Sequence, residues 1–152
     1  MDYFDDINSC KYIYLGKIEE PKDNTLRLII EEAVTNSEEQ SIEIGTREIS
    51  GVHAIQVTEN SRVFEVRFED YIGYSVLSES FAIPDDDEKF KGRLFCIYDK
   101  SNYLEYIKKA SFACDDHPGP FQHYGFNCLN HIVDVVSVDE PIVKLIAPNA
   151  TN

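Results

Sequence analysis

The chain has 152 residues, of which 14 are basic and 28 acidic, so that its formal net charge is −14 at pH 7. Each third of the chain carries an acidic excess, and a surface of this kind repels nucleic acid and anionic membranes and attracts a basic partner. Apolar residues make up 43% of the sequence, which argues against disorder, and no run approaches the roughly 18 apolar residues of a membrane span.

The cysteines and the first residues indicate a cellular compartment. The four cysteines are sparse and form no Cys-x-x-Cys pair, and the first six residues lack the basic start and apolar run of a signal peptide. We therefore expect one domain with reduced thiols in the cytoplasm. The cysteines are Cys10, Cys96, Cys114 and Cys128.

The N-terminal third predicts a polar start followed by short strands. Residues 1–10 are expected to be loosely ordered. Apolar and polar residues then alternate or cluster in runs of strand length, separated by turn-forming residues. The predicted elements are a strand at 12–20, a turn at 23–24, a strand at 26–34, a polar loop at 36–40 and a short strand at 42–44, which Gly45 ends.

The clearest alternation lies in residues 62–69. Phe64, Val66 and Phe68 fall on one side of an extended chain and charged residues on the other, which is typical of a half-buried antiparallel strand. The same alternation continues through Ile72, Tyr74 and Val76. Residues 52–83 are therefore predicted to be a meander of three strands whose apolar side faces the core.

A change of period predicts the main helix at residues 101–112. Leu104 and Ile107 recur at helical spacing, Asp99 or Ser101 can cap the first turn, and two lysines suit the last turn. Further short strands are predicted at 94–98, 121–128, 131–137 and 142–146. The predicted fold class is α+β, a mainly antiparallel sheet with this helix packed on one face.

Two Cys-x-x-His pairs form the best metal candidate. Cys114 with His117 and Cys128 with His131 could supply two sulfurs and two imidazoles to tetrahedral zinc. Against this, His117 precedes a stiff Pro-Gly-Pro turn, and strand alternation sets the directions of the second pair. Sparse cysteines in a β-rich domain are usually core residues, so we expect no bound metal and no cofactor.

A catalytic site is weakly indicated. His117, His123 and His131 could act with nearby acids as a general base or bind a metal, but none has an evident orienting partner in the sequence. Nucleophile-elbow motifs and phosphate-binding glycine loops are absent from the sequence.

The longest acidic run, Asp85-Asp86-Asp87-Glu88, follows a proline that ends a strand. Its spacing does not match a calcium-binding loop. It is either a solvated loop or a patch that meets lysine and arginine side chains of a partner, and we take Asp85, Asp86, Asp87 and Glu88 as the first candidates for partner contact.

Four segments of the sequence carry a family resemblance: Arg67–Phe81, Gly92–Leu104, Pro118–Tyr124 and Asn130–Ser137. They resemble segments of small acidic bacterial proteins, some of which are immunity partners of contact-dependent inhibition or related polymorphic toxin systems. The N-terminal third has no matching segment. The resemblance implies binding and no catalysis.

The leading hypothesis is an immunity protein that binds and neutralises a cognate toxin domain in the cytoplasm. Many toxins are nucleases with basic surfaces, which an acidic partner can cover. The alternatives are a small metal-binding or hydrolytic enzyme that uses the region of His117, His123 and His131, and a structural subunit of a larger assembly.

Overall fold

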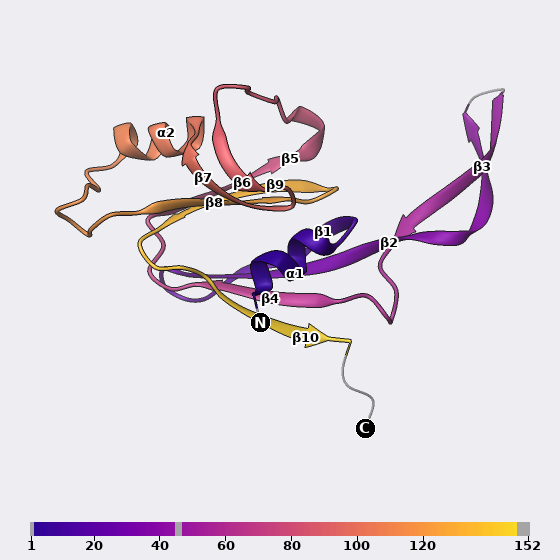
Figure 1. Cartoon of the computed structure of the whole chain (residues 1–152), viewed down its shortest axis with the longest axis horizontal. Coiled ribbons are helices and arrows are strands. Elements are labelled where there is room, and N and C mark those ends of the chain that lie inside the picture. The colour runs from indigo at the N-terminus through magenta and orange to yellow at the C-terminus, as the bar shows by residue number, and fades with distance from the viewer. Residues whose placement is uncertain (1, 45–46, 149–152) are drawn as a thin grey trace.

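A computed structural model describes the backbone of residues 2–44 and 47–148 and the side chains of residues 2–35 and 54–148. Within these residues the chain forms two five-stranded antiparallel sheets and two α-helices (Figure 1). This confirms the predicted α+β class with mainly antiparallel pairing. In chain order the elements are α1 (Tyr3–Ser9), β1 (Tyr12–Lys22), β2 (Thr25–Ile44), β3 (Arg47–Gln56), β4 (Val63–Phe68), β5 (Gly73–Ser78), a 3-10 turn η1 (Glu79–Phe81), β6 (Lys89–Gly92), β7 (Phe95–Lys100), α2 (Asn102–Ala110), β8 (Gln122–Asn127), β9 (His131–Ser137) and β10 (Ile142–Ala147).

The strand pairing differs from the predicted meander. The first sheet has the order β1-β2-β4-β10, with β3 paired to the far half of β2, and the second has the order β5-β9-β8-β7-β6. The three strands expected to form a meander therefore do not pair with one another. Alternation sets which side of a strand is buried, but it does not choose the neighbouring strand.

The main core lies between the two sheets, which face each other in Figure 1. Phe64, Val66 and Phe68 of β4 are fully buried there, as their alternation predicts. The ring of Phe68 meets those of Tyr124 and Phe126 in the opposite sheet, with centroids 5.5 and 6.4 Å apart. Aromatic side chains thus join the two sheets.

The prediction that residues 1–10 are loosely ordered is wrong for the described part of that segment. Residues 3–9 form α1, whose first turn is capped by the Asp2 carboxylate through the Phe4 amide at 3.0 Å. Ile7 is fully buried in the main core. Two apolar residues per helical turn suffice to dock a short helix, and a segment of seven residues is too short to show that period clearly.

A second correction concerns residues 36–40, which were expected to form a loop. The backbone of β2 continues through them to Ile44 and pairs with β3. In Figure 1 this part of β2 and β3 extends away from the two sheets as a separate arm. Gly45, expected to end the run, lies outside the described residues. Polar residues can join a strand here because the ladder is formed by backbone groups, whatever the side chains.

Helix α2 lies on the outer face of the second sheet, away from the main core. Ser101 caps it, and Leu104 and Ile107 pack against Val136 of β9. The helix and its cap agree with the prediction. The helix covers the outer face of β8 and β9 and also packs on Ile72, which lies in the segment 52–83. Neither described α-helix is long and apolar enough to cross a membrane.

The alternation predicted for Ile72, Tyr74 and Val76 is only partly realised. Tyr74 packs on the main core, Ile72 packs beneath α2, and Val76 is exposed. The reason is the place of β5, which is an edge strand of the second sheet.

Candidate functional site

The acidic loop predicted to bind a partner lies between η1 and β6, and half of it has a structural role. Asp85 Oδ2 accepts a hydrogen bond from the Asn102 side chain at 2.8 Å, and Glu88 Oε2 accepts one from the Asn102 amide at 3.0 Å. Glu88 thus satisfies an amide in the first turn of α2, where negative charge is favoured, and Asp85 holds the Asn102 side chain. Hydrogen bonds, first from the Asp87 amide and then from Asn102, lower the pKa of Asp85.

The remaining acids of this loop are free for a partner. Asp86 and Asp87 are exposed, and beside them in the chain Phe81 is 74% and Ile83 is 87% exposed. We call Phe81, Ile83, Asp86 and Asp87 the loop surface. The sequence reasoning missed its two apolar members. Their signal was an apolar run ending at a proline, which reads equally well as a buried strand end.

A buried hydrogen-bonded chain joins a serine, a histidine and an aspartate on the outer face of the second sheet. His123 of β8 bonds Ser101 Oγ through Nδ1 at 2.6 Å and Asp134 of β9 through Nε2 at 2.7 Å. The imidazole stacks on Tyr98 with centroids 4.2 Å apart and is almost fully buried. Of the three predicted histidines, His123 is the one that has acquired orienting partners.

The hydrogen-bonded series Ser101–His123–Asp134 has the residue types of a nucleophile, base and acid, but the helix α2 covers it. Ser101 is 2% exposed, and its hydroxyl oxygen also accepts the Leu104 amide at 3.0 Å as the cap of α2. Both ring nitrogens of His123 are engaged. A nucleophile must reach a reacting atom, and here the helix covers it. The hydrogen bonds that join Ser101, His123 and Asp134 therefore attach α2 to the second sheet.

Sequence reasoning named His123 but neither Ser101 nor Asp134 as its partner. The signal for Asp134 was available, because period-two alternation places it on the same face of the hairpin as His123. The contact with Ser101 depends on how α2 folds back over the sheet, which no local pattern shows.

The other two histidines lie apart from this chain. His117 is exposed in the loop after α2, where its ring stacks on Phe112 with centroids 6.4 Å apart. His131 begins β9, and its Nδ1 atom is buried without a hydrogen-bond partner. The residues His117, His123 and His131, expected to form one enzyme site, therefore lie in three separate environments.

The candidate zinc ligands are divided in the same way. Cys114 and His117 precede β8, whereas Cys128 and His131 follow it at its opposite end. Cys128 is buried in the main core, and burial raises the pKa of its thiol to about 12. Among the described side chains, those of residues 2–35 and 54–148, no group of three or more cysteine, histidine or acidic residues is placed to hold a metal ion.

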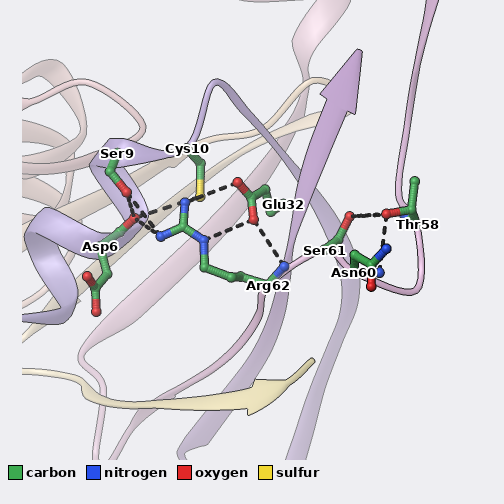
Figure 2. Close-up of polar contacts among 8 residues, drawn as sticks. All are labelled: Asp6, Ser9, Cys10, Glu32, Thr58, Asn60, Ser61 and Arg62. Carbon is green, nitrogen blue, oxygen red and sulfur yellow. Dashed lines mark hydrogen bonds and ion pairs between the residues drawn. The ribbon is translucent and has the colours of Figure 1, made fainter. Parts of the chain in front are cut away.

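A charged cluster fastens α1 to the first sheet (Figure 2). Arg62, just before β4, donates to both carboxylate oxygens of Glu32 at 2.9 and 3.0 Å. It also donates to the Asp6 carbonyl at 3.3 Å, to Ser9 Oγ at 3.1 Å and to Cys10 Sγ at 3.3 Å. The hydrogen bonds from Arg62 to the Glu32 carboxylate lower the pKa of Glu32. We call this cluster the Arg62 clasp.

A pocket of about 370 Å³ opens beside α1 at the margin of the two sheets. Aromatic and apolar side chains form most of its wall, and charged groups complete it. Its volume lies within the roughly 300–1,000 Å³ of small-ligand sites. The lining residues are Asp2, Tyr3, Phe4, Lys91, Phe95, Ile97, Tyr124, Glu140, Pro141 and Val143.

Comparison with known proteins gave no match. No protein-family model, curated protein or solved structure showed significant similarity to the chain.

Proposed function

We propose that the protein is an immunity protein that binds a cognate toxin domain with a basic surface, of nuclease type, and neutralises it in the cytoplasm. The observation that carries this proposal is the loop surface, where exposed apolar and acidic side chains adjoin on a molecule of net charge −14. The resemblance of the sequence segments to small acidic immunity proteins agrees with it.

The two kinds of side chain on this surface suit different stages of binding. Exposed carboxylates attract a basic partner over distance and raise the association rate. Large apolar side chains become buried on contact and slow dissociation, as anchor residues do in protein interfaces. Phe81 and Ile83 are among the most exposed large apolar side chains of the described residues, and a partner would remove them from water.

The arrangement of the histidines favours binding over catalysis. The one serine, histidine and aspartate chain in the described residues is closed by its own helix. A binding protein needs no accessible nucleophile, whereas a hydrolase does.

The test uses the C-terminal domain of the protein encoded immediately upstream. Its expression alone should arrest growth, and co-expression of this chain should restore growth. In surface plasmon resonance, Phe81→Ala should raise the dissociation rate at least tenfold, about 1.4 kcal/mol. The matched control is Phe112→Ala, because Phe112 is also exposed, at 88%, but lies beyond the other end of α2.

The electrostatic part has its own matched pair. Neutralising Asp86 and Asp87 to Asn should slow association severalfold and flatten its salt dependence. Neutralising the exposed Asp115 and Asp116 removes the same charge from another loop and should change association less. A chain that neither binds the upstream domain nor protects against it would overturn the proposed function.

A further inference from the structure

The pocket beside α1 has four aromatic rings in its lining, contributed by three elements. Tyr3 and Phe4 come from α1, Phe95 from β7 and Tyr124 from β8, and Val143 of β10 lies among them. The ring centroids of Phe4 and Phe95 are 5.4 Å apart, and those of Phe95 and Tyr124 are 6.4 Å apart. Phe95 and Tyr124 are each only 4% exposed, so a side chain that enters from outside meets mainly the half-buried rings of Tyr3 and Phe4.

The charges around these rings are mainly negative. Asp2 and Glu140 are exposed residues of the pocket lining. Burial raises the pKa of Tyr124 to about 12, and the carboxylates of Glu140 and Asp139 add to the effect. Tyr124 of the pocket lining therefore lies in a negative field, which favours a positively charged occupant.

One ring of the pocket already holds a cation. The Lys91 ammonium lies over the Phe4 ring, 5.5 Å from its centroid. Attraction of a cation to an aromatic face is strongest for desolvated groups. Lys91 is exposed, so its flexible stem can withdraw when another cation takes this position.

We propose that the pocket receives a basic side chain of the protein partner, with arginine preferred. This inference rests on the proposed function and locates an anchor point for it. A guanidinium is planar, stacks on aromatic rings and pairs with carboxylates through two hydrogen bonds, whereas an ammonium is a strongly hydrated point charge. Tyr3 and Phe4 supply the accessible rings, the buried Phe95 and Tyr124 lie behind them, and Glu140 supplies the carboxylate at the rim.

The pocket and the loop surface can belong to one interface. Strand β6 begins directly after Glu88 and contains Lys91 of the pocket lining. Four residues of extended chain span about 13 Å, well inside the footprint of an ordinary protein interface, about 800 Å² on each partner. The loop would attract the partner, and the pocket would hold it.

The test needs no toxin. The probe is N-acetyl-arginine-N-methylamide, titrated into the isotope-labelled protein and followed by two-dimensional NMR. We expect saturable shifts at Phe4, Ile97 and Tyr124, and at least fivefold weaker binding of the neutral citrulline analogue. Glu140→Gln should weaken arginine binding at least threefold, whereas Glu59→Gln, an exposed acid in the β3–β4 turn, should not.

Lys91 gives a test of opposite sign. Lys91→Met removes a competing cation and should strengthen arginine binding severalfold, whereas Lys89→Met changes the same charge two residues away and should have a smaller effect. Equal binding of citrulline, equal effects of Glu140→Gln and Glu59→Gln, weaker binding by Lys91→Met, or no saturable shift would each overturn the inference.

The two proposals can fail separately. Binding of the arginine probe without binding of the upstream toxin domain leaves the pocket and removes the immunity role. Tight binding of the toxin domain that Glu140→Gln leaves unchanged, with no arginine binding, leaves the role and removes the pocket.

Discussion

Single asparagine side chains connect segments that are far apart in the sequence. Asn8 Oδ1 accepts the backbone amides of Arg93, Leu94 and Phe95 at 2.9, 2.8 and 3.2 Å. Its amide nitrogen donates to the carbonyls of Phe4 and Phe95 at 3.0 and 2.9 Å. One side chain with both a donor and an acceptor thereby satisfies backbone amides of the tight turn between β6 and β7, whose carbonyls accept from Asn127 of β8.

Replacing Asn8 by Ala should lower the free energy of unfolding by about 2–3 kcal/mol, because partly buried amides lose their acceptor. Asn8→Asp keeps the acceptor but sets a carboxylate oxygen against the carbonyls of Phe4 and Phe95, so it should also be destabilising. Urea denaturation measures both. Asn60→Ala, in an exposed turn, should stay within about 0.5 kcal/mol. An equally small change in the free energy of unfolding for Asn8→Ala would show that the turn between β6 and β7 is stable without the Asn8 side chain.

At the scale of elements, the Arg62 clasp joins α1 to strands β2 and β4. A helix of seven residues is unstable alone, so its order depends on the clasp and on the burial of Ile7. Because Arg62 lowers the pKa of Glu32, the clasp is at full strength above the ordinary carboxyl value of 4.5 and weakens as the pH falls through the lowered value.

Arg62→Met should cost about 2–3 kcal/mol, since it leaves the mostly buried Glu32 carboxylate without its partner. The amides of α1 should also exchange with deuterium faster than those of β4. Lys108→Met removes an exposed pair with Glu105, 3.6 Å apart, and should change stability by less than about 0.5 kcal/mol. Unchanged exchange in α1 would show that Ile7 alone holds the helix.

Several elements were predictable because their signals are local. The alternation in β4 follows from its own residues, and α2 has helical spacing and a serine cap within one segment. The pairing of β4 with β2 and β10 was not predictable, because many partners satisfy the same alternation. Helix α1 was missed because its seven residues make only two turns, which are too few to establish a helical period.

The same division holds for the candidate site. The acidic loop was found from composition. The hydrogen bonds of Asp85 and Glu88 to Asn102 were not, because Asn102 lies fourteen or more positions further along the sequence. The residues that line the pocket beside α1 come from four separate segments, so no sequence motif predicts the pocket. The separation of the Cys-x-x-His pairs follows from the strand between them, which the sequence did predict.

At the scale of the whole molecule, burial raises the pKa values of several thiol and phenol groups. Burial raises the pKa of the Cys10 and Cys96 thiols to about 11 and that of Tyr103 to about 12. Ordinary values are 9.0 for cysteine and 10.0 for tyrosine. Because the folded values are raised, these groups contribute their full stability below pH 9, and that contribution is lost as the pH rises towards 12.

We therefore expect the urea midpoint to be flat from pH 7 to about 8.5 and to fall steadily above pH 9. Tyr103→Phe should reduce the slope between pH 10 and 12, by up to about 1.4 kcal/mol per pH unit. Tyr106→Phe, at an exposed site on the same helix, should leave it unchanged. A midpoint that stays level to pH 11 would contradict the prediction.

The place of β10 has a consequence for the order in which the chain folds. This strand forms the edge of the first sheet and pairs with β4, so that Ile142 lies opposite Arg67. During synthesis on a ribosome, β4 therefore waits with one open side while the entire second sheet is made. Closing such a long loop is slow, and an unpaired strand edge invites association with other chains. Nascent chains should thus be most prone to aggregate just before residue 142 emerges.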